Sequence, residues 1–123
     1  MEDNYKKRLG RQGEELAALF LQRQGMKILC RNYTIRGGEL DIIALDGQTY
    51  VFCEVKTRTS QKFGTGAEAI DRKKQQALLR TAQVYAAKQG ILEKPMRFDV
   101  VDILLGKDGK HKLSYIKNAE LCI

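Results

Sequence analysis

Apolar residues recur at the spacing of an amphipathic helix in two long stretches of the chain. The first stretch covers about residues 5–24 and is followed by Gly25, a residue type that often ends a helix. Its apolar face is formed by Leu9, Leu16, Ala17, Phe20 and Leu21. The second stretch begins at the capping-box pattern Thr65–Glu68 and continues to Gly90. The sequence therefore predicts two long helices.

Short apolar runs fill most of the remaining chain. We expect strands at about residues 26–33, 40–45, 49–55, 96–105 and 113–116. Asp46 and Gly47, between the second and third runs, are a strong hairpin signal. The order of one helix, three strands, one helix and two strands predicts an α/β fold, with a mixed β-sheet flanked by helices on both faces. Because the chain has only 123 residues, we expect residues 1–123 to form a single domain.

Charged residues interrupt the two apolar runs of the predicted hairpin. Glu39 and Asp41 share one face of the first strand, and Glu54 and Lys56 share one face of the second. A two-residue loop would place Glu54 opposite Glu39, and a four-residue loop would place it opposite Asp41. Either loop puts all four side chains on one face, whereas a regular three-residue loop would do so only with a bulge.

The charge balance indicates the kind of partner. The chain has 22 Lys and Arg residues and 15 Asp and Glu residues, a net charge of +7, which favours a polyanion such as nucleic acid. No stretch approaches the roughly 18 consecutive apolar residues of a membrane span, so we expect no membrane partner. The first residues carry charges of both signs without an apolar segment, so we expect no secretory signal and a cytoplasmic location.

The residue types that could hold a metal are also limited. One histidine and three widely spaced cysteines do not make a zinc cluster, so we expect reduced thiols and a metal held mainly by carboxylates. Carboxylates that converge beside a lysine could bind a hard divalent cation and leave positions for water and a phosphate oxygen. The lysine could then hold the attacking water or offset charge on the phosphate. Taken alone, however, Glu54 and Lys56 are better explained as an ion pair on an exposed strand.

Several motifs together resemble a known family. They are Gly13-Glu14, Gly38–Ala44, Val51–Arg58, Phe63-Gly64 with Glu68–Ile70, and Arg97–Val101. In this order and spacing they closely resemble the YraN-like family of uncharacterised proteins over nearly the whole chain. That family is similar to Holliday junction resolvases and to restriction-endonuclease-like nucleases. The resemblance implies a restriction-endonuclease-like core.

The resemblance also implies roles for individual residues. The positions that match the catalytic pattern of these nucleases are Glu14, Asp41, Glu54 and Lys56, and Glu39 and Lys74 match auxiliary positions. Asp41 and Glu54 would hold Mg²⁺ or Mn²⁺. From helical spacing alone, Glu14 is equally well explained as a solvated residue. The chain departs from related recombination nucleases because it lacks their Gln-x-x-x-Tyr motif in the second helix.

Two functions remain open at this point. The first is a DNA-binding, metal-dependent endonuclease that hydrolyses phosphodiester bonds in branched or duplex DNA, as a homodimer if it cuts both strands of a junction. Its phosphate contacts would come from basic residues near the site, namely Arg11, Arg58 and Lys73. The alternative is a non-catalytic nucleic-acid-binding or adaptor module that retains the nuclease fold.

Overall fold

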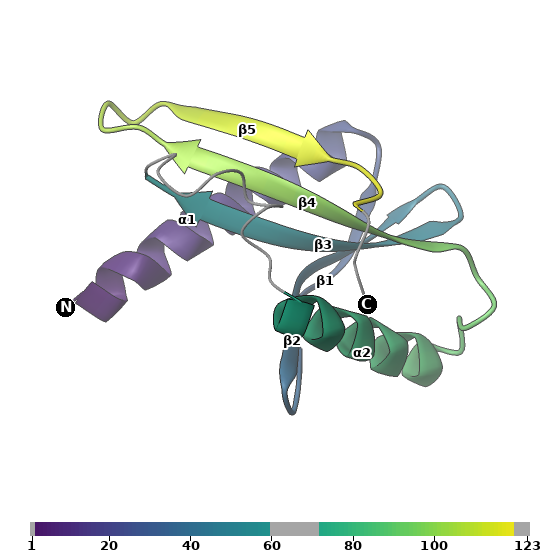
Figure 1. Ribbon diagram of the computed structural model, residues 1–123. Helices are drawn as coiled ribbons and strands as arrows, with labels where there is room; N and C mark the ends of the chain where they lie inside the picture. Colours follow the sequence, from purple (N-terminus) through teal and green to yellow (C-terminus); the bar gives the residue numbers. More distant parts are fainter. Residues whose placement is uncertain (1, 60–71, 120–123) are drawn as a thin grey trace.

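The computed structural model describes residues 2–59 and 72–119, in which helices and strands follow the predicted order (Figure 1). The elements are α1 (Glu2–Arg23), β1 (Lys27–Ile35), β2 (Gly38–Asp46), β3 (Thr49–Arg58), α2 (Arg72–Gln89), β4 (Met96–Leu105) and β5 (His111–Ile116). The expected capping box at Thr65–Glu68 and the Phe63-Gly64 motif lie outside the described residues. Neither α1 nor α2, as far as the chain is described, has the length and apolar character needed to cross a membrane.

The strands form one five-stranded sheet in the order β1-β2-β3-β4-β5. Strands β3 and β4 are parallel, because α2 lies between them in the chain, and the other neighbouring strands are antiparallel. The prediction of an α/β fold with a mixed sheet is confirmed, and it agrees with the core expected of restriction-endonuclease-like proteins.

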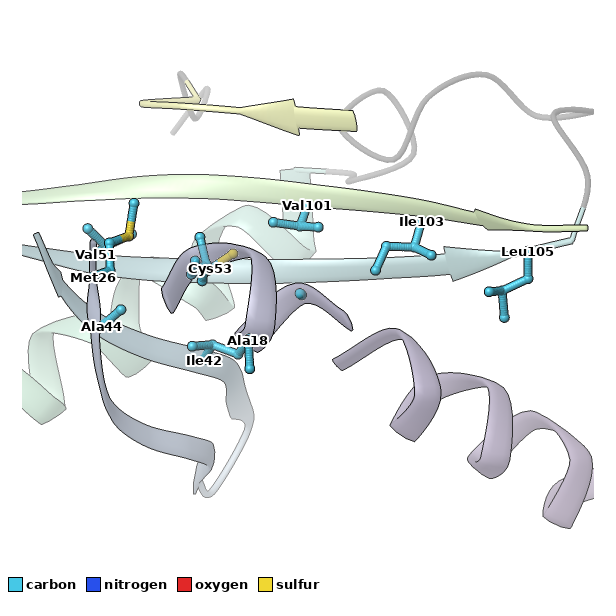
Figure 2. Close-up of a cluster of buried hydrophobic side chains, with 11 residues drawn as sticks. Ala18, Met26, Ile42, Ala44, Val51, Cys53, Val101, Ile103 and Leu105 are labelled. Atoms are coloured by element: carbon cyan, nitrogen blue, oxygen red, sulfur yellow. The ribbon is translucent and has the colours of Figure 1, made fainter. Parts of the chain in front are cut away.

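The two helices pack on opposite faces of the sheet. Alternation along β2 sends Ile42 and Ala44 toward α1 and Ile43 toward α2. Figure 2 shows the cluster on the α1 side, where Cys53 and Val101 lie among the buried aliphatic side chains. Burial on both faces explains why the central strands read as nearly continuous apolar runs.

A glycine allows α1 to lie unusually close to β3. Gly13 is buried, and a Cβ atom at this position would lie only 1.7 Å from Oγ1 of Thr57. Any other residue would push the helix away from the strand. The close approach places the next residue, Glu14, beside the end of the β2–β3 ladder.

The β2–β3 turn settles the register that the sequence left open. Asp46 pairs with Thr49, so Gly47 and Gln48 form the turn, with Gly47 at a φ of 62°. Leu45 pairs with Tyr50, which is the register expected of the four-residue loop. The additional pair of Asp46 with Thr49 shortens the turn itself to two residues.

Strands β2 and β3 then separate. Their ladder ends at the pair Ile42 and Cys53, although β2 stays paired with β1 as far as Gly38, and β3 stays paired with β4 as far as Arg58. The β1–β2 end turns toward α2, where Arg80 donates a hydrogen bond to the Gly37 carbonyl at 3.1 Å (Figure 1). We call the opening between the two strands the fork.

Candidate active site

Asp41 lies at the start of the fork. Asp41 comes directly before Ile42, the β2 residue at which the pairing with β3 ends. Its Oδ2 accepts a hydrogen bond from the backbone amide of Val55 at 2.8 Å. The side chain thereby supplies the acceptor that the separated strand no longer offers to this amide. This hydrogen bond orients the Asp41 carboxylate.

Glu54 lies beside Asp41 in a nearly dry environment. Its side chain is only 8% exposed. Burial, followed by the hydrogen bond and charge of Asp41, raises the pKa of Glu54 to about 9. Two adjacent carboxyl groups in such surroundings hold a proton unless a cation neutralises them.

Two lysines provide positive charge next to these acids. Lys74, on the first turns of α2, places its Nζ 3.6 Å from Oε1 of Glu54. Burial opposes its charged form, but the Glu54 carboxylate prevails and raises the pKa of Lys74. Burial and the neighbouring Lys74 lower the pKa of Lys56. The two ammonium groups are therefore electrostatically different, although both lie next to the carboxylates.

Glu14 reaches the same cluster from α1. Burial raises its pKa, and the charge of Asp41 adds to the effect, while Asn32 and Arg31 oppose it. The Asn32 side chain favours the ionised form of Glu14, and a guanidinium nitrogen of Arg31 lies 4.0 Å from Oε1 of Glu14. The helix acid is thus held from the neighbouring strand β1 and electrostatically coupled to the fork.

The contribution of β1 was not predicted from the sequence. Asn32 has a φ of 54°, and this left-handed backbone interrupts the regular alternation of the strand, so that consecutive side chains both interact with Glu14. The signal available in the sequence was the residue type, because asparagine is rare in strands and common in left-handed conformations. Arg31 also donates a hydrogen bond to Glu15 at 2.7 Å.

Two hollows lie at this site. One, of about 160 Å³, is lined by Glu39, Asp41, Glu54 and Lys74 and by α2. The other, of about 410 Å³, is lined by Glu14 and Lys56 and by other residues of α1 and β3; we call it the seam hollow. The candidate residues therefore line two depressions in the surface, and Glu54 is the most buried of them.

The structure places the remaining predicted residues outside this cluster or at its edge. Glu39 is exposed at the rim and is not paired with β3, because the β2–β3 ladder ends at Ile42 and Cys53. Arg58 points to β4, where its Nε and Nη2 donate to Asp102 at 3.2 and 2.8 Å. The two other predicted phosphate-binding residues, Arg11 and Lys73, are exposed on α1 and α2.

Asp99, by contrast, belongs to a separate structural network. It is 1% exposed and accepts hydrogen bonds from Arg97, from the Tyr115 hydroxyl and from the backbone amide of Asn118. These bonds join β4 to the segment that follows β5. The carboxylate is thereby satisfied by protein groups and has no place in the candidate site.

The donor set fits a hard divalent cation with few protein ligands. Among residues 2–59 and 72–119, no group of three or more His, Cys, Asp or Glu side chains is placed to hold a metal ion. Asp41 and Glu54 are two adjacent oxygen donors, and Mg²⁺ is commonly bound by one or two carboxylates with water and substrate phosphate completing its shell. Such a cation would also neutralise the charge of Asp41, which adds to the effect of burial in raising the Glu54 pKa.

The family model of the uncharacterised protein family UPF0102 matches residues 13–103. The chain belongs to this family. Similar members are UPF0102 proteins of Symbiobacterium thermophilum and of Alkaliphilus metalliredigens, which are 45% and 42% identical over 113 residues. These alignments cover 92% of this chain and 96% and 97% of the relatives. A UPF0102 protein of Nocardia farcinica is 46% identical over 112 residues, or 91% of this chain and 88% of the relative. The part matched by the family model includes the whole candidate cluster.

Proposed function

We propose that this protein binds DNA and hydrolyses a phosphodiester bond in it with the help of Mg²⁺ or Mn²⁺. The observation that carries the proposal is the convergence of Asp41 and Glu54 with Lys56 and Lys74 at the fork. Paired carboxylates with a neighbouring ammonium group are the equipment that metal-assisted phosphodiester hydrolysis requires. The resemblance of the motifs to nuclease families supports the same reaction.

Each residue has a distinct role in this proposal. Asp41, oriented by the Val55 amide, and Glu54 hold the cation. When bound, the cation would polarise the phosphate and lower the pKa of a coordinated water. Lys56 orients the attacking water and offsets negative charge that grows on the phosphate. Glu14, held by β1, accepts a hydrogen bond from water at the site, and Lys74 stabilises the ionised form of Glu54.

Charge on the surface supports binding of a polyanion. The net charge is +7, and Arg11 and Lys73 are exposed on the two helices that flank the sheet. Phosphate contacts of this kind make the binding constant fall steeply with salt, and a flat salt dependence would contradict the proposal. Branched DNA is the substrate that the resemblance to junction resolvases favours, and symmetric cutting of a junction requires a homodimer.

The test compares the wild type with Lys56→Ala and with Lys88→Ala. Both variants remove one lysine, but Lys88 is exposed in the last turn of α2 and lies outside the cluster. After circular dichroism has shown matched folds, labelled duplex, single-stranded, flap and four-way-junction DNA are incubated with Mn²⁺, Mg²⁺ or EDTA.

Cutting that depends on the metal, survives in Lys88→Ala and disappears in Lys56→Ala would support a nuclease and identify its preferred DNA. Binding without cutting by the wild type under every condition would instead support a non-catalytic nucleic-acid-binding or adaptor module.

A further inference from the structure

A third hollow lies where α1 passes the turn between β4 and β5. It has a volume of about 430 Å³. Its lining includes Tyr5, Leu9 and Gln12 of α1, Thr59 after β3, and Lys107 and Lys110 of the turn. We call it the turn hollow. None of the residues that line it has a role in the proposed hydrolysis.

The turn hollow adjoins the seam hollow, which lies at the candidate site. Leu9 lines both the turn hollow and the seam hollow, which also contains Glu14 and Lys56. Along α1, the nine residues from Glu14 to Tyr5 span about 14 Å at 1.5 Å per residue. Along β3, the three residues from Lys56 to Thr59 span about 10 Å. A strand bound at the fork can therefore follow the α1–β3 seam to the turn within a few nucleotides.

The side chains at the turn hollow suit a nucleotide. Tyr5 is 52% exposed and offers a ring face for stacking. Lys107 and Lys110 are exposed, and neither forms an ion pair with another residue in the described part of the chain. The acid between them, Asp108, accepts a hydrogen bond from the Lys110 amide at 3.1 Å, and no described acidic side chain lines the hollow. An aromatic ring beside two cations is the combination that binds single-stranded nucleic acid.

We propose that the turn hollow binds an unpaired stretch of the same DNA strand that the fork holds, with one base stacked on Tyr5 and phosphates at Lys107 and Lys110. This inference rests on the proposed function and names its substrate class: DNA with a single-stranded segment next to the scissile phosphate. A duplex would contact the two lysines through its phosphates, but its stacked bases would leave the tyrosine unused.

The test measures binding of the full chain in EDTA by fluorescence anisotropy, with a blunt duplex and the same duplex carrying a single-stranded tail. The variants are Tyr5→Ala, Tyr5→Phe and the double variant Lys107→Ala/Lys110→Ala. The matched control is Lys88→Ala/Lys94→Ala, which removes two exposed lysines from α2 and the loop after it.

Tyr5→Ala should weaken binding of the tailed DNA roughly tenfold and leave the blunt duplex unchanged, while Tyr5→Phe keeps the stacking and the affinity. The Lys107/Lys110 double variant should weaken the tailed DNA similarly and reduce the slope of log K against log salt by about 1.4, since each contact to a single strand contributes about 0.7. The control variant should retain the wild-type preference for the tail.

The inference is overturned if Tyr5→Ala weakens both DNAs equally, or if the control variant loses the tail preference as strongly as the Lys107/Lys110 variant. Because binding is measured in EDTA, these results do not depend on cutting. A retained tail preference without metal-dependent cutting would contradict only the proposed hydrolysis, and failure to bind either DNA would contradict both proposals.

Discussion

Replacement of Gly13 by alanine should loosen the contact on which the position of Glu14 depends. The added Cβ would lie 1.7 Å from Oγ1, 2.9 Å from Cβ and 3.0 Å from Cγ2 of Thr57. Rotation of the threonine moves Oγ1 and Cγ2 but leaves its Cβ in place, so α1 itself has to shift. Overpacking costs about 1–3 kcal/mol, and the upper part of that range, about 2–3 kcal/mol, applies here because the Thr57 Cβ cannot rotate away. Alanine regains roughly 1 kcal/mol over glycine through its higher helix propensity. We expect a net loss of about 1–2 kcal/mol.

Gly10 provides the matched control within the same helix. A Cβ at Gly10 meets nothing within 4 Å, so Gly10→Ala should stabilise the protein by about 0.5–1 kcal/mol through helix propensity alone. The two substitutions are chemically identical and should have opposite signs. Urea unfolding followed by far-UV circular dichroism measures both, since the chain contains no tryptophan.

A double-mutant cycle assigns the cost to the contact with β3. In a Thr57→Ala background, two of the three crowded atoms are removed, so Gly13→Ala should cost about 1 kcal/mol less than in the wild type. The reasoning is refuted if Gly13→Ala unfolds at the wild-type urea concentration, or if the two substitutions are simply additive.

Four other substitutions test electrostatic features. In EDTA, wild-type stability should fall as pH rises from 4.5 to about 9, because folded Glu54 keeps a proton that the unfolded chain releases. In urea titrations, the free energy of unfolding of Glu54→Gln relative to that of the wild type should grow by up to about 1.4 kcal/mol per pH unit. A difference that stays constant with pH would contradict the raised pKa of Glu54. Asp99→Ala removes the buried acceptor of an arginine and a tyrosine and should cost about 3–5 kcal/mol in the same assay, whereas a loss below about 1 kcal/mol would show that the network is dispensable. Arg58→Ala should lower stability by about 3 kcal/mol, because buried Asp102 loses the guanidinium that contacts it. Arg11→Ala should leave stability within about 0.5 kcal/mol and reduce the salt slope of duplex binding by about 1. The reverse pattern would make Arg58 the phosphate contact.

The helices, the strands and their order were predictable because they depend on local patterns. Apolar spacing located α1, and the Asp46-Gly47 signal located the β2–β3 hairpin. For the register of the β2–β3 hairpin, the sequence left two loops of even length open, because local spacing does not determine the length of a turn. The proximity of Asp41 and Glu54 followed from one of these alternatives.

The fork and its consequences depend on contacts between distant parts of the chain. A regular ladder would have continued past Ile42 and Cys53 to pair Asp41 with Glu54 and Glu39 with Lys56. In the structure, β2 stays with β1 and β3 stays with β4 beyond that point. The partner of Arg58 was likewise hidden, because Asp102 is 44 residues away and meets it only through the parallel β3–β4 pairing. Motif spacing therefore identified the acids and lysines of the site, but it did not predict the strand separation that orients their side chains.

The fork also makes Asp41 a structural residue as well as a candidate ligand. Its carboxylate satisfies the Val55 amide, which the separated strands leave without a ladder partner, and the same hydrogen bond fixes its distance from Glu54. Loss of metal binding or cutting in Asp41→Ala would therefore be ambiguous, because an unsatisfied buried amide costs about 1–3 kcal/mol and disturbs the strand that carries Glu54. Asn at this position can still accept the amide hydrogen bond through its carbonyl oxygen while removing the negative charge. Asp41→Asn is consequently the substitution that separates the chemistry of this carboxylate from its support of the fork.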